Sequence, residues 1–283
     1  MRADLHGSIF SFCRRILLYM MIVYSKQDVA SENAASSLRE AAGFSELGSI
    51  KGHAVYGSEG VRMLELDTAM VDAGFLDDMV ETDLLVFLSK HRSEKGVASF
   101  TVHAEGNWSG KADLGGVPRQ LSYSSPARML AVLAALKRAG TDGLDVVYEA
   151  THHGPLLVTP SMFIEVGGND SVIADKRFAA VLANAANEAL VEKRAQEFDT
   201  VAVGIGGMHY SQKFTRLALE GKYAFAHIMP KYYVAETGML AQAFIRSDMK
   251  PEKAVIEWKS INAAERDSII RGLGELGIDY DRV

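Results

Sequence analysis

The sequence predicts a three-layer α/β/α fold in which helices cover both faces of a mostly parallel β-sheet. Short apolar runs rich in β-branched residues alternate along the chain with longer segments whose apolar residues recur at helical spacing. No internal repeat or low-complexity linker separates these segments. The chain has 283 residues, of which 48% are hydrophobic and 23% charged, an ordinary composition for a globular protein. We therefore expect a single α/β domain over residues 21–283.

The expected strands are apolar runs at residues 21–25, 83–88, 99–103, 144–148, 162–166, 201–203 and 225–228. The expected helices cover residues 30–42, 127–139, 177–197, 212–220 and 263–276. Gly43 ends the first helix, while Pro126 and Gly140 flank the second, because proline suits the first turn of a helix and glycine its end. The third helix is rich in alanine, with apolar residues at helical spacing.

Residues 1–20 are expected to be a translated leader or a disordered tail outside this domain. They contain Arg14 and Arg15 before an apolar stretch at 16–24, but no signal-peptide cleavage site is evident. The apolar stretch is also too short to span a membrane. The true start would then be Met20 or Met21, and the expected location is the cytoplasm.

Cysteine usage restricts the chemistry of the domain. The only cysteine, Cys13, lies in the expected leader, so the domain itself has no thiol. This excludes disulfide bonds, cysteine-ligated zinc and a cysteine nucleophile. A metal ion in the domain would have to be bound by histidine, carboxylate or backbone groups.

The most informative motif, residues 149–155, places Glu149, His152 and His153 directly after the expected strand at 144–148. Ligands of open α/β sheets bind at the carboxyl ends of the strands. Neutral imidazole is the commonest metal ligand and the commonest general base near pH 7. Adjacent residues of a strand point to opposite sides, so both imidazoles reach one site only if the chain turns there, as the following Gly-Pro pair allows. Alternatively, one histidine caps a turn and the other packs as an aromatic ring.

Three further expected strand ends carry a histidine. His103 ends the strand at 99–103, His209 follows a glycine-rich segment after 201–203, and His227 lies in the strand at 225–228. Taken singly, each is more often a structural histidine than a ligand, but together they indicate one site. We expect one cleft that is lined by Glu149 and five histidines, namely His103, His152, His153, His209 and His227.

Several of these segments resemble one known family. Residues 101–107, 149–155 and 204–210 resemble the signature segments of the archaeal- and plant-type D-aminoacyl-tRNA deacylases, as do residues 22–28, 89–93 and 159–167. The resemblance extends over residues 21–275, with the motifs in the same order. It implies a mixed, mostly parallel sheet related to the phosphorylase and peptidyl-tRNA hydrolase type. It also implies a zinc-linked hydrolase that removes D-amino acids from mischarged tRNA.

Hydrolysis of an aminoacyl-tRNA ester needs an activated water, a stabilised oxyanion and a grip on the terminal adenosine. Zn²⁺ can supply the first two, and so can a histidine base with backbone N–H donors. The expected catalytic residues are Glu149, His152, His153 and His209, and the expected metal ligands are His103, His152, His153, His209 and His227. Asn107 and the backbone of Gly206 and Gly207 are expected to bind substrate, with a packing role for these glycines as the alternative.

The net charge of −6 at first argues against a nucleic-acid partner, but phosphate contacts need only a local basic rim. Lys213 and Arg216 follow the segment of His209 and are the expected phosphate contacts. Without the resemblance, ordinary solvated side chains would be the better interpretation. The expected partner is tRNA charged with a D-amino acid, with no membrane and no protein partner implied, and we expect a monomer.

Two other classes of function stay open at this point. One is a zinc-dependent peptidase or amidohydrolase that uses the same His/Glu cluster on a small acyl-amino substrate. A basic rim around the cleft would favour tRNA over such a substrate. The other is a non-catalytic nucleotide- or tRNA-binding protein, which convergence of the histidines on one point would disfavour.

Overall fold

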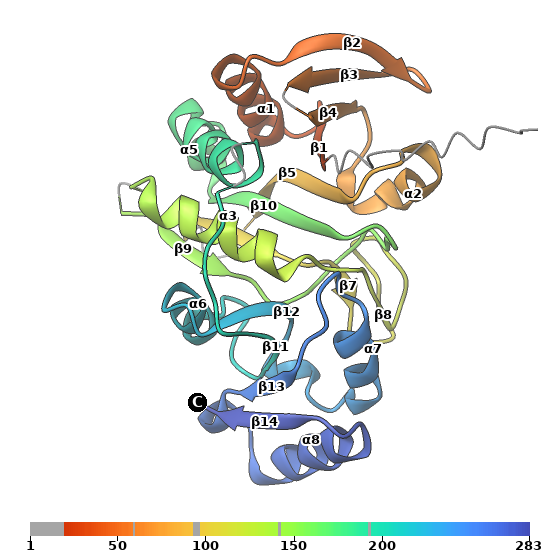
Figure 1. Ribbon diagram of the computed structural model, residues 1–283, viewed down its shortest axis with the longest axis vertical. Coiled ribbons are helices and arrows are strands. Elements are labelled where there is room, and N and C mark those ends of the chain that lie inside the picture. Colours follow the sequence, from red (N-terminus) through yellow and green to blue (C-terminus); the bar gives the residue numbers. More distant parts are fainter. Residues whose placement is uncertain (1–19, 59, 93–96, 141–142, 192–193) are drawn as a thin grey trace, which may run out of the picture.

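The computed structural model describes residues 20–58, 60–92, 97–140, 143–191 and 194–283, and these form two β-sheets with helices packed on their faces (Figure 1). Residues 1–19, most of the expected leader, lie outside the described residues. Met20, the last residue assigned to that leader, is the first residue of strand β1 (Met20–Ser25) and is buried. Among the described residues, no helix has the length and apolar character needed to cross a membrane.

The larger sheet has eight strands in the order β2-β3-β4-β1-β5-β10-β6-β9. Besides β1, these strands are β2 (Ser45–Ile50), β3 (His53–Ser58), β4 (Val61–Leu66), β5 (Leu84–Arg92), β6 (Ser99–His103), β9 (Asp145–Tyr148) and β10 (Ser161–Gly168). Strands β4, β1, β5 and β10 are parallel neighbours, and β6 is parallel to β9. Strand β6 is antiparallel to β10, and β2, β3 and β4 form an antiparallel meander, so the sheet is mixed.

The smaller sheet has four parallel strands in the order β12-β11-β13-β14. They are β11 (Thr200–Ile205), β12 (Tyr223–Met229), β13 (Lys253–Ile256) and β14 (Asp279–Arg282). Two further short strands, β7 (Gly106–Asn107) and β8 (Gln120–Leu121), pair with each other. The sequence predicts a single sheet, and the structure has two. An alternation of strands and helices indicates parallel neighbours, but it does not determine which sheet the next strand joins.

The helices are α1 (Val29–Ala41), α2 (Leu76–Met79), α3 (Pro126–Arg138), α4 (Asp170–Ile173), α5 (Lys176–Ala186), α6 (Gln212–Leu219), α7 (Leu240–Ile245) and α8 (Ala263–Glu275). Helices α1, α3 and α5 cover one face of the larger sheet (Figure 1), and their apolar residues share a core with that face. A 3₁₀ turn (Met70–Phe75) and α2 cover part of the opposite face. The predicted layering and the mostly parallel, mixed sheet are thus confirmed.

Helix α3 lies where the two sheets approach each other, packing against β6 and β12. One continuous cluster of buried side chains includes Val86 and Ile164 from the larger sheet and Phe225 and Ile228 from the smaller. The two sheets therefore share a core, and the loops between them are held on both sides.

Each expected strand and helix is present, with shifts of one to three residues at most ends. The helix expected at 177–197 is shorter, because α5 ends at Ala186 and a π-helical turn (Asn187–Val191) follows. The meander β2-β3-β4 was not predicted. Strand β2 is an edge strand with almost every residue exposed, so it lacks the apolar alternation by which strands are recognised.

Candidate active site

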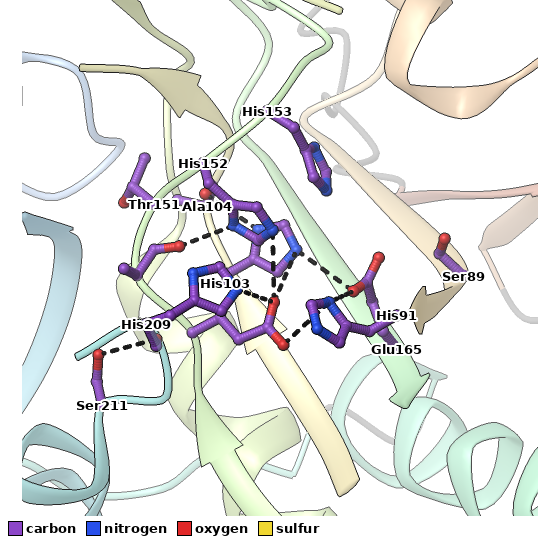
Figure 2. Close-up of polar contacts among 12 residues, drawn as sticks. Ser89, His91, His103, Ala104, Thr151, His152, His153, Glu165, His209 and Ser211 are labelled. Carbon is purple, nitrogen blue, oxygen red and sulfur yellow. Dashed lines mark hydrogen bonds and ion pairs between the residues drawn. The ribbon is translucent and has the colours of Figure 1, made fainter. Parts of the chain in front are cut away.

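Seven ionisable side chains converge where the two sheets meet. They come from β5, β6 and β10 and from the loops that follow β9 and β11: His91, His103, Glu149, His152, His153, Glu165 and His209. Figure 2 shows the imidazoles of His103, His152 and His209 turned toward one another, with His91 and Glu165 beside them. The ring centroids of His152 and His209 are 4.5 Å apart, and those of His152 and His103 are 4.3 Å apart.

The loop at 149–155 is held from both sheets by backbone hydrogen bonds. The N–H of Glu149 donates to Val102 O of the larger sheet (3.1 Å), and the N–H of Thr151 donates to Ile228 O of the smaller (2.9 Å). The buried indole Nε1 of Trp108 donates to Thr151 O (2.9 Å). The loop is therefore fixed in place before any ligand binds.

The chain turns at His153, whose φ of 42° is in the left-handed region. This turn brings both adjacent imidazoles to one side, with ring centroids 4.3 Å apart. A turn at this point is the condition under which two adjacent histidines can share one site. Gly106 N–H binds the carbonyls of both histidines and holds the turn. A Cβ on Gly154 would lie 2.2 Å from Gly116 N, so only glycine fits directly after the double histidine.

Glu149 is the centre of the cluster, and its carboxylate is fully buried. Its Oε1 lies 3.3 Å from His91 Nδ1. Its Oε2 lies near the Nε2 atoms of three further imidazoles: His152 at 3.5 Å, His209 at 3.6 Å and His103 at 3.9 Å. Neither oxygen has a hydrogen-bond partner within the described residues.

Glu165 and His91 belong to the cluster, although the sequence analysis did not select them. Glu165 Oε2 lies 3.6 Å from His91 Nδ1 and 3.7 Å from His103 Nε2. The register explains the contact, because β10 pairs Phe163 with His103 on one side and Gly167 with His91 on the other. Both residues occur in segments that carry the family resemblance, 89–93 and 159–167, which was the available signal.

Backbone carbonyls select the tautomers of three imidazoles. The Nδ1 atoms of His152, His153 and His103 lie 2.9, 2.6 and 3.2 Å from the carbonyl oxygens of Ala150, Gly154 and Ala104. A carbonyl can only accept, so each Nδ1 carries the proton and each Nε2 is an unprotonated lone pair. In the cluster, the Nε2 atoms of His152 and His103 therefore face carboxyl oxygens, and only a proton on the carboxyl group or a cation can lie favourably between them.

Burial shifts the ionisation of the cluster strongly. Burial and the neighbouring imidazoles of His103, His153 and His209 hold the pKa of His152 well below its usual value, and burial lowers the pKa of His153 and of His209 to about 4. Burial, assisted by the Glu165 charge, raises the pKa of Glu149 well above its usual value. Burial alone would raise the pKa of Glu165 too, but the imidazoles of His103 and His91 lower it.

The donor set fits a metal cation. Three overlapping groups have ligand atoms within 4.8 Å of one another: His91, Glu149, His152 and His209; His103, His152 and His153; and His103, Glu149 and Glu165. Buried lone pairs that face each other without a donor repel, and a cation among them removes that cost. Nitrogen and oxygen ligands without thiolate suit several divalent metals, zinc included. Metal-binding histidines typically donate their other ring N–H to a carbonyl or carboxylate, which fixes the orientation of the ring, as the Nδ1–H groups do here.

Two pockets open onto the cluster. One has a volume of about 490 Å³ and extends over the face of the larger sheet, past Phe163 and Met70. The other has a volume of about 260 Å³ and extends past Trp108 to Tyr232 and Tyr233. Both are lined by Leu114, His152, His153 and His209, so a reacting group at these histidines is accessible from either pocket.

Comparison with known proteins shows the family of the chain. A family model described as D-aminoacyl-tRNA deacylase matches residues 79–280. The chain is 34% identical over 269 residues to a D-aminoacyl-tRNA deacylase of Pyrococcus furiosus, covering 92% of this chain and 98% of the relative. It is 35% identical over 261 residues to one of Ignicoccus hospitalis, covering 91% and 97%. The chain belongs to the D-aminoacyl-tRNA deacylase family.

This family assignment confirms the resemblance drawn from the sequence motifs. The crystal structure of AF0625, a conserved protein of unknown function, has the same fold as this chain. The TM-score is 0.85 and the sequence identity is 30%. The likeness covers 93% of this chain and 95% of that one. The mixed α/β architecture with two sheets is therefore shared with an experimental structure over nearly the whole chain.

In this structure His227 lies outside the cluster, although the sequence analysis expected it to be a metal ligand. Its Nε2 lies 2.8 Å from Arg246 O and therefore donates, while its Nδ1 accepts from Thr151 Oγ1 at 3.3 Å. The Thr151 hydroxyl in turn accepts from Ile228 N–H at 3.1 Å. Both ring nitrogens are thus occupied, and burial lowers the pKa of His227 to about 4. The neutral imidazole therefore links the loop at 149–155 to the smaller sheet.

The glycines of this deacylase-family chain fit the packing alternative better than the substrate-binding one. Gly206 N–H donates to Met229 O and Gly207 N–H donates to Ser260 Oγ, so neither is available for an oxyanion. A Cβ on Gly206 would lie 2.6 Å from Ser260 Oγ, and its φ of 101° also favours glycine. These glycines let Ser260 and its neighbour Glu257 pack closely against the end of β11.

The other expected substrate contacts lie at different distances from the cluster. Asn107 lines the smaller pocket, and its side-chain Nδ2 donates to Gly115 O at 2.9 Å. Lys213 and Arg216 are on α6 and line neither of the two pockets. Arg216 forms an exposed ion pair with Glu220 at 3.0 Å. The basic residue that does line the smaller pocket is the exposed Lys111.

Proposed function

We propose that this protein hydrolyses the ester bond of D-aminoacyl-tRNA and releases the D-amino acid and free tRNA. The observation that carries the proposal is the convergence of unprotonated imidazole nitrogens and carboxylate oxygens around Glu149, at the junction of two pockets. Membership of the family supports the choice of substrate, because relatives from Pyrococcus furiosus and Ignicoccus hospitalis are named D-aminoacyl-tRNA deacylase.

We propose Zn²⁺ as the metal, because the ligand set has no thiolate and is dominated by neutral imidazole. When bound, zinc polarises the ester carbonyl and makes a water molecule acidic enough to attack near neutral pH. Seven donors converge, more than a four-coordinate ion uses, so the chain keeps groups for proton transfer. His209 and His152 have the most exposed rings next to Glu149, with side chains 32% and 20% exposed.

The protein's own residues divide the remaining work. The backbone carbonyls of Ala150, Gly154 and Ala104 fix the tautomers, so each inward nitrogen can bind a cation or accept a proton. Glu149, within 4 Å of four imidazoles, holds these rings in a common orientation. His209, the more exposed of the two, faces both pockets and would take a proton from water and return it to the ribose oxygen, while His152 stays available to bind the metal.

The test is deacylation of D- and L-tyrosyl-tRNA, each corrected for spontaneous hydrolysis, before and after removal of metal with a chelator. The expected result is rapid release of D-tyrosine, slow or no release of L-tyrosine, loss of activity with chelator and recovery with Zn²⁺. His152→Ala is the matched inactive variant, and His227→Gln, which changes an imidazole outside the cluster, is the matched control. Cleavage of small acyl-amino amides without cleavage of D-tyrosyl-tRNA would replace this proposal with the amidohydrolase alternative.

A further inference from the structure

Two pockets meet at one set of side chains, and their chemistry differs. We name them the sheet pocket, lined among others by Ala69, Met70 and Phe163, and the tyrosine pocket, lined among others by Lys111 and Tyr232. Both reach the same three histidines, and the exposed side chain of Leu114, 62% accessible, stands between them.

An ester carbonyl has two substituents that leave it in different directions. If the carbonyl carbon of the substrate lies at His152 and His209, the acyl group and the ribose oxygen must diverge from that point. The molecule offers one pocket for each direction, because both pockets begin at these rings. With the carbonyl carbon at that point, the two halves of the substrate would occupy different pockets, and the chemistry of the linings decides which half fits which pocket.

The tyrosine pocket suits a nucleoside joined to a polyanionic chain. The ring of Tyr232 is 52% exposed and packs against Tyr233, with centroids 4.8 Å apart at an angle of 66°. An exposed aromatic face binds a base by stacking whatever the base, and a lysine beside it suits a phosphate. Lys111 is exposed on this pocket's rim, and the exposed carboxylate of Asp113 lies on the same rim, so the aromatic face, rather than the charge, is the main reason to place a nucleoside here. At about 260 Å³, the pocket holds one nucleoside and leaves the rest of a long chain outside.

The sheet pocket suits an amino-acid side chain. Its wall near the cluster is formed by Phe163, which stacks on His103, and by Met70 of the 3₁₀ turn. The carboxylate of Asp28 at its far end already accepts hydrogen bonds from the N–H groups of Ala30, Ser31 and Lys90. The ammonium of Lys90, which also lines this pocket, lies 3.6 Å from the same carboxylate, so the two charges offset each other. A volume of about 490 Å³ is typical of a small-molecule site.

We propose that the tyrosine pocket binds the 3′-terminal adenosine by stacking on Tyr232 and that the sheet pocket receives the amino-acid side chain. This assignment rests on the proposed deacylase function. It makes Tyr232 a binding residue common to all substrates and Ala69, an exposed residue at the wall of the sheet pocket, a position that controls the accepted side-chain size.

Three variants and three substrates test the assignment. Tyr232→Ala should raise KM about tenfold for D-tyrosyl-tRNA and for D-alanyl-tRNA alike, because base stacking is lost, whereas Tyr232→Phe should keep KM near that of the unaltered protein. Ala69→Trp should lower kcat/KM at least tenfold more for D-tyrosyl-tRNA than for D-alanyl-tRNA. The Tyr232 hydroxyl also lies 3.4 Å from His209 Nδ1, so Tyr232→Phe, which removes this contact and keeps the ring, is the reference variant. D-Tyrosine ethyl ester lacks the nucleoside, so Tyr232→Ala and Tyr232→Phe should hydrolyse it at the same rate, whereas Ala69→Trp should slow its hydrolysis.

Circular dichroism and metal content confirm that each variant is folded and loaded. The assignment is overturned if Tyr232→Ala discriminates between the two tRNA substrates, if Ala69→Trp affects both equally, or if neither variant changes either constant. In those cases the unaltered protein still cleaves D-tyrosyl-tRNA, and the proposed function stands. If the unaltered protein fails to cleave D-tyrosyl-tRNA, the proposed function itself is wrong and the assignment falls with it.

Discussion

The Nε2 atom of His152 and the Oε2 atom of Glu149, three residues apart in sequence, lie 3.5 Å apart, and the imidazole supplies no proton between them. Ala150 O holds the His152 proton on Nδ1, so a nitrogen lone pair faces a carboxylate oxygen inside the protein. Such an arrangement is unfavourable on its own, and a divalent cation makes it favourable. The same holds for His103, whose buried Nε2 has no hydrogen-bond partner within the described residues.

Replacing ligands should remove metal, and replacing His227 should not. In His152→Ala and His103→Ala we expect metal content to fall well below that of the unaltered protein, with turnover lowered by at least a hundredfold. His227→Gln should keep full metal content, because both ring nitrogens of His227 bond to protein groups. Elemental analysis of dialysed protein measures the metal per chain. Retention of metal by both alanine variants would show that the cluster is not the metal site.

Loss of chemistry and loss of tRNA binding should separate. His209→Ala should lower turnover by about 10²–10⁴-fold, the usual contribution of a general acid–base group, and leave the Kd for tRNA nearly unchanged. Lys111→Ala should instead weaken binding at low salt and reduce its salt dependence, because a phosphate contact releases counterions. Both quantities come from single-turnover deacylation and from binding titrations at several salt concentrations.

Arg216→Ala is the matched control for Lys111→Ala. The structure pairs Arg216 with Glu220 away from the two pockets, so we expect little change in tRNA affinity. The sequence-based expectation of a phosphate contact at Arg216 predicts the opposite. A larger loss of affinity in Arg216→Ala than in Lys111→Ala would place the tRNA backbone along α6.

Trp108→Phe should weaken the attachment of the loop at 149–155. The indole is almost fully buried and donates to Thr151 O, so phenylalanine leaves a buried carbonyl without its partner, at a cost of about 1–3 kcal/mol in the free energy of unfolding. Metal affinity should fall as well, since His152 follows Thr151 directly. Urea unfolding and metal titration measure the two effects. The other tryptophan, Trp258, stacks with Arg266 and Arg282, and Trp258→Phe should affect stability alone.

The sequence analysis selected the candidate site residues at the ends of expected strands, and it did not select His91 and Glu165. His103, His152, His153 and His209 follow expected strands, so the ends of the apolar runs were a sufficient signal. Glu165 lies within the buried strand β10, where the sequence pattern indicates core. Its contact with His91 and His103 depends on β10 pairing between β5 and β6, and the sequence pattern does not determine strand order.

His227 illustrates the opposite error. It occupies a strand, as expected, but the side-chain direction and the neighbouring Arg246 carbonyl determine what the ring can bind. Arg246 is nineteen residues away in sequence and follows α7, so no local pattern could show this contact. The glycines at 206 and 207 likewise gave a correct prediction of close approach, while the approaching groups, Ser260 and Glu257, come from a distant segment.

The neutral His227 should make the protein less stable in acid. Burial lowers its pKa to about 4 in the folded protein, against about 6.5 in an unfolded chain. The unfolded chain therefore takes up the proton first as the pH falls, so stability that is complete above pH 6.5 is lost progressively towards pH 4, by up to roughly 3 kcal/mol. In His227→Gln, the amide can donate to Arg246 O and accept from Thr151 without titrating, so the free energy of unfolding should fall less over this range.

Urea unfolding at pH 7, 5.5 and 4.5, with chelator in every sample, separates this effect from metal release. Arg216→Ala, which leaves every imidazole in place, should follow the unaltered protein. If the curve of His227→Gln runs parallel to that of the unaltered protein, proton uptake at His227 does not contribute to acid unfolding.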